Sequence, residues 1–262
     1  MSKGKYYFSK SLEKGLKILA LFNGKTPTLT QSEIAKTLGL NMTSTYRYIN
    51  TMVEMGYLEK EAKTKSIRPS IHCLLMCINL MHAADNLKMI KEVVDRLNYE
   101  KNISIDMAFG VEDSLVRIYH KEAEETLTYS LPEFTKNCLH NTALGKAYLS
   151  SLPDRLIAEK ISTLELVAKT EKTIIDRDKL HQEIEKTKER GFAMAEEEYL
   201  PGVLAIAAPL HDPITGMGVG AVSFDFSVLQ HSSAELIATY GKLIQETAAI
   251  LSELLPAGKN HR

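Results

Sequence analysis

Two short helical segments lie between residues 30 and 56, and almost nothing separates them. The first begins with the sequence TQSE at residues 30–33, a hydroxyl cap followed three positions later by Glu, and it ends at Gly39, a residue suited to the left-handed end of a helix. Asn41 then caps a second helix that ends at Gly56. Two helices joined by so short a Gly-containing turn predict a helix-turn-helix, whose second helix enters the major groove of duplex DNA.

A pair of strands is expected directly after the second helix. Residues 57–60 and 66–68 alternate in the manner of short strands, and the polar residues 61–65 between them predict a turn. This hairpin would form the wing of a winged helix-turn-helix. The alternative is a plain helical bundle, because any small bundle can contain two capped helices with a short connection. The hairpin weighs against that alternative.

The face of the second helix opposite its apolar stripe carries short, polar or amide-bearing side chains and one Arg. Arg pairs well with guanine and Asn with adenine, while Ser and Thr reach bases or phosphates. A helix that is only solvated would more often carry Glu and Lys pairs, whereas this helix has a single acid, Glu54. The residues expected to contact duplex DNA, with the two lysines of the wing as phosphate contacts, are Gln31, Ser32, Met42, Thr43, Ser44, Tyr46, Arg47, Asn50, Lys63 and Lys65.

Charge is distributed unevenly along the chain. Residues 1–70 contain 12 Lys and Arg but only 5 Asp and Glu, a balance of +7, whereas the whole chain has 32 Lys and Arg, 33 Asp and Glu and a net charge of −1. The remainder therefore carries −8. Phosphate binding needs a basic surface, and an acidic body would not itself be drawn to DNA. The basic part coincides with the predicted helix-turn-helix, which a random split of charge would not produce.

Length and composition are those of an ordinary protein of two globular domains, with 262 residues, 44% of them hydrophobic and 25% charged. No apolar run approaches the ~20 residues needed to cross a bilayer, and residues 1–6 lack the apolar segment of a signal peptide. The three cysteines, Cys73, Cys77 and Cys138, make no disulfide framework, which indicates a reducing, cytoplasmic location. Neither their spacing nor any other cluster predicts a metal site, and no cofactor is expected.

Two amphipathic helices are expected to flank the DNA-binding unit. Residues 9–22 carry an apolar face through Leu12, Leu16, Leu19 and Phe22, and residues 71–82 repeat apolar side chains at helical spacing. The second helix either packs on its own domain or serves as an interdomain strut or a dimer contact. Because the two helices carry more apolar surface than one small domain covers, a homodimer or a dimer of dimers is predicted. The predicted domains are residues 1–69 for DNA binding, 70–86 for a linker helix and 87–262 for the remainder.

Helices and strands are mixed in the remainder. A helix over residues 87–102 should direct Met89 and other apolar side chains inward, and residues 103–109 alternate apolar with Ser104, Asp106 and Ala108, the period of a half-buried strand. Further strands are expected at residues 115–120, 127–131, 202–210 and 217–226, and further helices at 141–150, 153–161, 178–190 and 233–255. This order predicts an α+β domain in which helices pack on an antiparallel sheet.

The ordered succession of short motifs resembles the IclR family of bacterial transcriptional regulators over nearly the whole chain. The most recognisable stretch is LHNTALGKA at residues 139–147. The other matching segments are residues 11–19, 33–40, 44–47, 56–58, 173–180, 190–193, 196–198, 206–209 and 220–223, together with Gly202. Single segments are weak signals, whereas their succession at the expected places is a strong one.

The resemblance implies a winged helix-turn-helix joined by a linker helix to a GAF-like antiparallel-sheet domain that binds an effector. Family members bind double-stranded operator DNA as a dimer or a dimer of dimers, under the control of a small catabolic metabolite. Their pocket is bounded by the helix that starts near Gly145 and by the last two strands. Carried over residue by residue, the effector-binding residues would be Asn141, Thr142, Ala143, Gly145, Val203, Ala205, Ser223 and Asp225.

This chain departs from the family pattern at two of these positions. Where some members place Cys just before the Ile-Ala-Ala-Pro stretch, it has Ala205, and where many members have a second Ser, it has Asp225. An ionised Asp would oppose a bare carboxylate ligand unless a proton or cation intervened, whereas it would suit a ligand hydroxyl or amine. The family's tendency to sense small organic acids is therefore not assumed here. The other interpretation of Asp225 is a salt-bridged or solvated residue at the end of a strand.

Two other classes of function were weighed. A hydrolase could in principle use Ser223, His140 and Asp225, but the chain has no Gly-x-Ser-x-Gly elbow, no run of metal ligands and no phosphate-binding Gly loop. An enzyme is therefore not expected. A ligand-independent DNA-binding protein is opposed by the large acidic C-terminal part, which would add nothing to affinity for DNA. A pocket filled with bulky side chains would support that second alternative.

Overall fold

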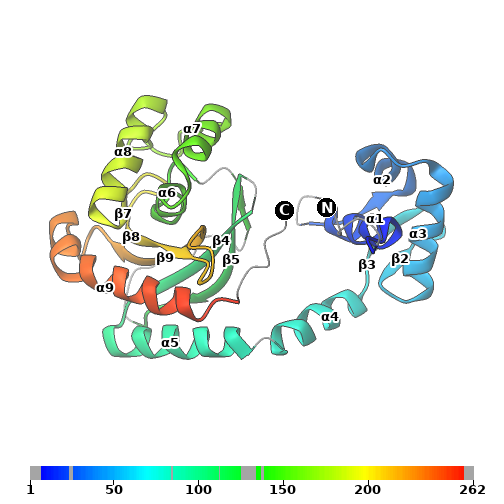
Figure 1. Ribbon diagram of the computed structural model, residues 1–262, viewed down its shortest axis with the longest axis horizontal. Helices are drawn as coiled ribbons and strands as arrows, with labels where there is room; N and C mark the ends of the chain where they lie inside the picture. Colours follow the sequence, from blue (N-terminus) through cyan, green and yellow to red (C-terminus); the bar gives the residue numbers. More distant parts are fainter. Residues whose placement is uncertain are drawn as a thin grey trace. The chain divides into compact units, whose positions relative to one another are not determined.

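The computed structural model describes residues 7–23, 26–83, 85–111, 113–124, 134–136 and 139–256. They form two compact units, residues 1–84, called the head below, and residues 85–262, called the body. Each unit is considered by itself (Figure 1). The strand expected at residues 127–131 and the cysteine at position 138 lie outside the described residues.

The head is built from short helices and a small three-stranded sheet. Its elements are α1 (Lys10–Ala20), β1 (Leu29–Thr30), α2 (Gln31–Leu38), α3 (Met42–Glu54), β2 (Leu58–Lys60), β3 (Ser66–Pro69) and α4 (Ile71–His82). The strands pair antiparallel in the order β1-β3-β2. The core of the head joins α1, α2, α3 and the hairpin through Ile18, Ile34, Ile49, Leu58 and Ile67.

The predicted caps of the helix-turn-helix are confirmed. The N–H of Glu33 donates to Oγ1 of Thr30 at 3.3 Å, and the Glu33 carboxylate accepts from the N–H of Thr30 at 2.6 Å, which makes both halves of the capping box. Gly39 ends α2 with φ of 62°, and Asn41 caps α3 by accepting from the N–H of Ser44 at 2.8 Å. The wing is also present, because β2 and β3 pair and the N–H of Lys65 donates to the carbonyl of Glu61 at 3.0 Å across the turn.

The amphipathic first helix is present, and its apolar residues divide between the core and the surface. Leu12 and Leu16 are 63% and 58% exposed, whereas Gly15 and Ile18 are the buried residues of α1. The reason is close packing, since a Cβ on Gly15 would lie 3.1 Å from the Met52 side chain of α3. The turn of α1 that meets α3 is therefore the one that lacks a side chain, and the two leucines face away from the core of the head.

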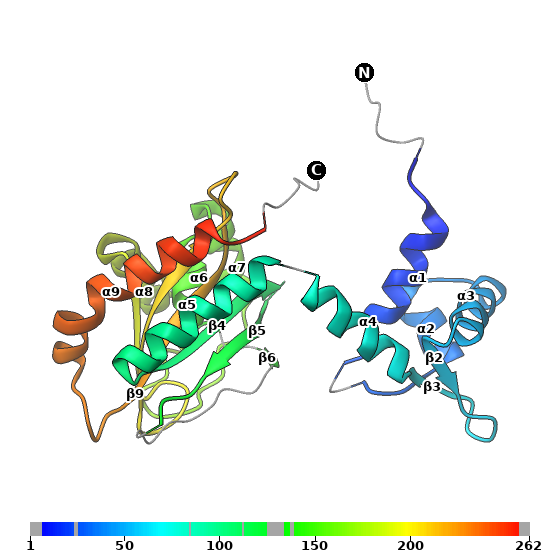
Figure 2. The same cartoon turned by 90° about the horizontal axis from the view of Figure 1, so that it is seen from below.

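The body is a six-stranded antiparallel sheet between two layers of helices (Figures 1 and 2). Its strands run in the order β6-β5-β4-β9-β8-β7. Helices α6, α7 and α8 pack on one face, and α5 and α9 pack on the other. The elements are α5 (Asp85–Lys101), β4 (Ser104–Val111), β5 (Ser114–Lys121), β6 (Phe134–Lys136), α6 (Ala143–Ser150), α7 (Asp154–Thr163), α8 (Arg177–Arg190), β7 (Ala193–Glu196), β8 (Val203–His211), β9 (Gly218–Ser227) and α9 (Ser233–Glu253). The α+β class and the antiparallel sheet are thus confirmed.

The strand expected to be half-buried is buried on both faces. Ile105 and Met107 of β4 face the layer of α5 and α9, while Asp106 and Ala108 lie under the layer of α6 to α8, and all four are at most 1% exposed. The alternation of polar and apolar residues is real, but helices cover the polar face as well. The interior of the body consequently holds an aspartate that the sequence pattern had placed towards solvent. In α5, Met89 is 49% exposed rather than inward.

The capping box generates a test of head stability. Thr30→Ala removes the hydroxyl that accepts from α2, and we expect it to lower the free energy of unfolding of the head by about 0.5–2 kcal/mol. Urea unfolding followed by far-UV circular dichroism measures this loss. Thr28→Ala is the matched control, because Thr28 is exposed two residues before the cap. Equal losses in the two variants would exclude a specific contribution of the cap.

Candidate functional site

The exposed face of α3 gathers most of the residues expected to contact DNA. Thr45 and Ile49 are its buried side chains. On the other side Met42 and Tyr46 are 48% and 50% exposed, and Arg47 is exposed. The remaining predicted residues of this helix are Thr43, which is exposed, and Ser44 and Asn50, which are half-buried. The helix thus presents hydroxyl, phenol, amide and guanidinium groups on one side.

The neighbouring elements support this face. Nε2 of Gln31, at the start of α2, donates to the carbonyl of Met42 at 3.2 Å and so holds the beginning of α3, while Ser32 is exposed beside it. Lys63 and Lys65 are exposed in the turn of the wing. The ammonium of Lys60 lies 5.7 Å from the centre of the Tyr46 ring, a cation–π distance that ties the wing to α3. Sequence reasoning missed Lys60, because its position within a strand gave no sign of that contact.

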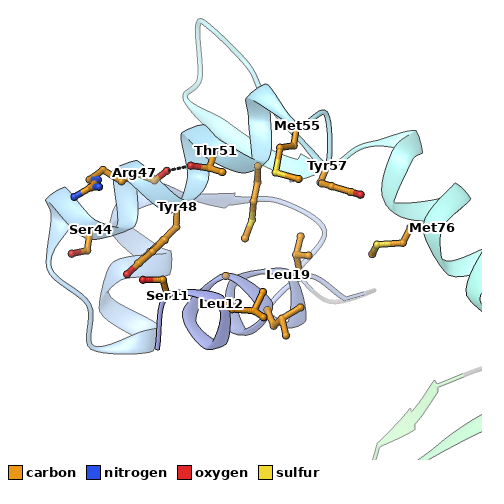
Figure 3. A pocket seen from close by; sticks show the side chains of 13 residues that line it. Ser11, Leu12, Leu19, Ser44, Arg47, Tyr48, Thr51, Met55, Tyr57 and Met76 are labelled. Carbon is orange, nitrogen blue, oxygen red and sulfur yellow. Dashed lines mark hydrogen bonds between the residues drawn. The ribbon is translucent and has the colours of Figure 1, made fainter. Parts of the chain in front are cut away.

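An open groove of about 540 Å³ lies between α1 and α3 (Figure 3). Leu12, Leu16, Leu19, Met52 and Met55 give it an apolar floor and walls, and Met76 of α4 also lines it. Ser44 and Arg47 lie along the α3 side of the same groove. The apolar surface that α1 leaves uncovered is therefore continuous with the helix that carries the expected DNA contacts.

The body contains a second, much smaller cavity at the start of α6. It lies between the residues before α6, strands β8 and β9, and the segment that joins β7 to β8. Its lining residues are Asn141, Thr142, Ala143, Leu144, Ala195, Glu198, Tyr199, Leu200, Val203, Ala205, Ser223 and Asp225. Seven of the eight predicted effector residues are thus brought together. The eighth, Gly145, lies one turn into α6, where its N–H donates to Oγ1 of the N-cap Thr142 at 3.0 Å.

The cavity holds about 30 Å³, room for roughly one water molecule. Most of its walls are small residues such as Ala143, Ala195 and Ala205. The bulky side chains are Leu144 at the start of α6 and Tyr199 and Leu200, which come from the segment between β7 and β8. The volume of the cavity is consequently limited in part by the segment between β7 and β8, whereas most residues that the strands contribute to its wall are small.

Glu198 is a lining residue that sequence reasoning did not select, although it belongs to the acidic run at residues 196–198. Its Oε1 accepts from Nζ of Lys146 at 2.5 Å, and the Lys146 side chain is only 1% exposed. Nζ of Lys146 also donates to the carbonyl of Met194 at 3.2 Å. Burial raises the pKa of Glu198 and the Lys146 charge opposes that rise. The ion pair therefore places a carboxylate at the cavity wall with its cation already engaged.

Asp225 lies beside a second aspartate on the same face of the sheet. Burial raises the pKa of Asp225 well above its ordinary value, and the charge and hydrogen bond of Asp106 on β4 raise it further. Oγ of Ser223 donates to both carboxylate oxygens of Asp225 at 3.2 Å. Oδ1 of Asp106 lies 3.4 Å from Nη1 of Arg117 and 3.0 Å from Nδ1 of His120. The raised pKa of Asp225 favours the protonated form of that carboxyl.

The arrangement does not assemble the hydrolase that was weighed as an alternative. Ser223 donates to Asp225, and Nε2 of His140 lies 3.1 Å from the carbonyl oxygen of Val167. His140 is not among the residues that line the cavity, so the described contacts give Ser223 no base other than a protonated carboxyl. Within the described ranges, no three His, Cys, Asp or Glu side chains come together as metal ligands, and no helix is long and apolar enough to cross a membrane.

A winged helix-turn-helix head followed by an α+β body with a small polar cavity is the architecture of a DNA-binding regulator with a separate effector domain. Family models identify which regulators these are. The model of the bacterial transcriptional regulator IclR C-terminal region matches residues 78–253, and the IclR helix-turn-helix domain matches residues 11–62. The chain belongs to the IclR family, a family of transcriptional regulators rather than of enzymes.

Individual relatives agree with this assignment. The HTH-type transcriptional regulator BhcR of Paracoccus denitrificans is 23% identical over 94% of this chain and 88% of its own length. A putative IclR transcriptional regulator from a Silicibacter species superposes with a TM-score of 0.76 at 18% identity, over 96% of this chain and 98% of that chain. An IclR homologue from Microbacterium hydrocarbonoxydans, crystallised with 4-hydroxybenzoate, has a TM-score of 0.64 at 17% identity, over 94% of this chain and 98% of that chain. The structural likenesses establish the fold.

The raised pKa of Asp225 leads to a prediction about how stability depends on pH. Because its pKa in the folded state is raised, the stability it contributes is fully present below the unfolded-state pKa near 4 and is lost as pH rises through the folded-state pKa. Asp225→Asn never ionises and keeps a donor towards Asp106. We therefore expect its free energy of unfolding, relative to wild type, to increase with pH by up to about 1.4 kcal/mol per unit within that window.

Urea unfolding of both proteins at several pH values between about 5 and 8 tests this sign. Asp178→Asn is the control, because the same substitution is made at an exposed position on α8. If the free energies of unfolding of Asp225→Asn and wild type differed by the same amount at every pH, the raised pKa of Asp225 in the folded protein would be contradicted.

Proposed function

We propose that this IclR-family regulator binds a two-fold operator as a dimer, and that a small metabolite in the body cavity controls that binding. The single observation that carries the DNA-binding part is the exposed polar face of α3, with Arg47 at its centre. The residues proposed to contact DNA are those gathered on this face, the start of α2 and the turn of the wing. The head also carries the basic part of the chain, which favours association with phosphate.

The proposal of ligand control rests on the cavity at the start of α6. The Asn141 side chain is fully buried at its wall, and neither its Nδ2 nor its Oδ1 has a hydrogen-bond partner. A buried amide is ordinarily satisfied, so this one is placed to receive a ligand. The Microbacterium homologue crystallised with 4-hydroxybenzoate supports the idea that proteins of this fold hold small molecules.

For a ligand to control operator binding, it must bind more tightly when the heads are in one arrangement than when they are in another. We propose that α4, within the linker expected at residues 70–86, transmits that preference, since it is the helix that precedes the body in the chain. A metabolite that binds the body equally well in all arrangements would change nothing, whatever its affinity. The measurable consequence is a ligand-dependent operator affinity.

Arg47→Ala tests the assignment of α3 as the recognition helix. We expect it to weaken specific operator binding by roughly 1–3 kcal/mol, because a guanidinium that pairs with a base edge is lost. Gel-shift or fluorescence-anisotropy titration against operator and random duplex DNA measures this change. Arg96→Ala is the control, since it removes the same charge from an exposed position of the body.

The two kinds of DNA separate the possible roles of Arg47. Loss of specific affinity alone places Arg47 at a base. A parallel loss on both DNAs, with a shallower dependence on salt, would assign it to phosphate instead. An affinity equal to wild type would remove Arg47 from the interface.

The proposed dimer rests on apolar surface that the head does not cover. Leu12 and Leu16 of α1 are more than half exposed, and so are Ile71, Leu74 and Leu80 of α4. Large exposed apolar surface of this kind marks an interaction site. We propose that a second copy of this chain covers it, because a two-fold dimer supplies two recognition helices for two half-sites. The groove between α1 and α3 would then receive side chains of the partner.

Leu16→Glu places a charge in that surface without touching the core of the head. We expect it to shift the protein towards monomer at micromolar concentration and to weaken operator binding, because a monomer engages one half-site. Light scattering coupled to size-exclusion chromatography measures the mass. Ile214→Glu is the control, since Ile214 is 74% exposed in the body. A Leu16→Glu protein that remains fully dimeric would place the interface elsewhere.

A further inference from the structure

The body cavity exposes an unusual set of unpartnered polar atoms to any ligand. Both amide atoms of Asn141 lack a partner, and so does Oε2 of Glu198, although these residues are 0% and 8% exposed. Native interiors rarely leave such groups unsatisfied. A ligand that met these atoms would therefore supply the hydrogen bonds that they do not find within the protein.

The cavity wall is rich in acceptors and lacks a free cation. None of its twelve lining residues is Lys, Arg or His, whereas two of them, Glu198 and Asp225, are acids. Lys146 of α6 is bonded to Glu198 and to the carbonyl of Met194, and Arg117 of β5 acts on Asp225 from beside Asp106. The one feature that would attract an anion is the start of α6, where the helix dipole is positive. A ligand carboxylate could lie there only if another group of the same ligand bonded to the carboxyls of Glu198 and Asp225.

We propose that the effector of this protein is a small metabolite with a primary ammonium group, which lies between Asp225 and the free oxygen of Glu198 while its other polar groups meet Asn141. This inference rests on the effector site proposed above and names its chemical class. A simple alcohol would satisfy Asn141 but could not exchange its charge for the proton of Asp225. A simple carboxylate would bring a second negative charge beside Glu198, and no Lys, Arg or His among the lining residues would meet it.

Binding of an ammonium group changes the state of Asp225. Burial and the neighbouring Asp106 raise the pKa of Asp225 and so favour its neutral form. The ammonium pairs with the ionised carboxylate, so the proton of Asp225 leaves to solvent as the ligand binds. The charged groups that face this site are Asp106, Arg117 and His120 from β4 and β5, Glu198 after β7, and Lys146 from α6. Affinity therefore rises with pH until the amine itself loses its proton.

The size of the cavity determines how a ligand can enter it. A space of about 30 Å³ does not hold an amine of several atoms, so the segment with Tyr199 and Leu200 must move outwards when the ligand enters. The walls formed by β8 and β9 stay in place, because they belong to the paired centre of the sheet.

Matched pairs of small compounds test the ammonium group directly. In each pair only an ammonium replaces a hydroxyl, as in glycine against glycolate and ethanolamine against ethylene glycol, with longer homologues of both series. The full-length protein is titrated with each compound, and its melting temperature and operator affinity are measured. We expect members of the ammonium series to raise the melting temperature in a concentration-dependent manner and their hydroxyl partners not to do so.

Asp225→Asn is the decisive variant, since it removes the carboxylate and keeps the size of the side chain. We expect it to lose at least about tenfold in affinity for the amine, and to lose the increase of wild-type affinity with pH. Asp178→Asn, exposed on α8, should behave as wild type. Unchanged amine affinity in Asp225→Asn would overturn the proposal, as would the lack of a response to every amine.

The two proposals fail in different ways. Stabilisation by the hydroxyl or acid partners alone, with an effect on operator affinity, would overturn the ammonium class and leave metabolite control intact. Stabilisation by amines that leaves operator affinity unchanged would support the ammonium class and contradict metabolite control.

Discussion

The close pairing of β4 with β9 at the centre of the body sheet is the contact on which the rest of this domain depends. Gly220 of β9 lies opposite Phe109, and a Cβ at Gly220 would stand 2.1 Å from the carbonyl oxygen of Ala108. The two strands therefore meet at a distance that excludes a side chain at this point. Their register in turn places Asp106 opposite Ser223, on the face covered by α6 to α8. The position of the acidic residues in the body follows from this register.

Burial of that face determines its chemistry. In a low-dielectric interior an isolated carboxylate is costly, so each acid near the cavity is neutralised in its own way. Glu198 is paired with Lys146, Asp106 lies beside Arg117 and His120, and burial together with Asp106 raises the pKa of Asp225. Each acid therefore meets the low-dielectric interior with a different kind of neighbour.

The head differs from the body, because two of its surfaces are left uncovered. Its core is small, and the helices that enclose it have outer faces of different polarity. The outer face of α3 is polar around Arg47, whereas the outer face of α1 is apolar at Leu12 and Leu16. Gly15 makes this possible by letting α1 lie against Met52, so that α1 is anchored through Ile18 and its leucines are not needed for the core. One short helical unit therefore offers a polar surface and an apolar surface at once.

Local features of the fold could be predicted from sequence because their causes are local. The capping box of Thr30 and Glu33, the cap of Asn41 and the left-handed glycines at positions 39 and 191 depend on side chains within three or four residues, and the expected helix and strand boundaries agree with the structure to within a few residues. Seven of the residues nominated for the cavity from the family resemblance also line it. The strand pattern correctly told which residues of β4 share a face.

What covers each face was decided only by tertiary structure. A period of two separates Asp106 from Ile105, but it carries no information about the helices that pack above and below, so the burial of Asp106 and the proton on Asp225 could not be read from it. Glu198 reaches the cavity from a segment between two strands, where no periodicity applies. Spacing placed Leu12, Leu16 and Leu19 on one apolar face of α1, and only the close approach of α1 to α3 at Gly15 decided which of them stay exposed. Sequence determined the local elements and the sides of each element, whereas packing between distant segments determined which of those sides meet water.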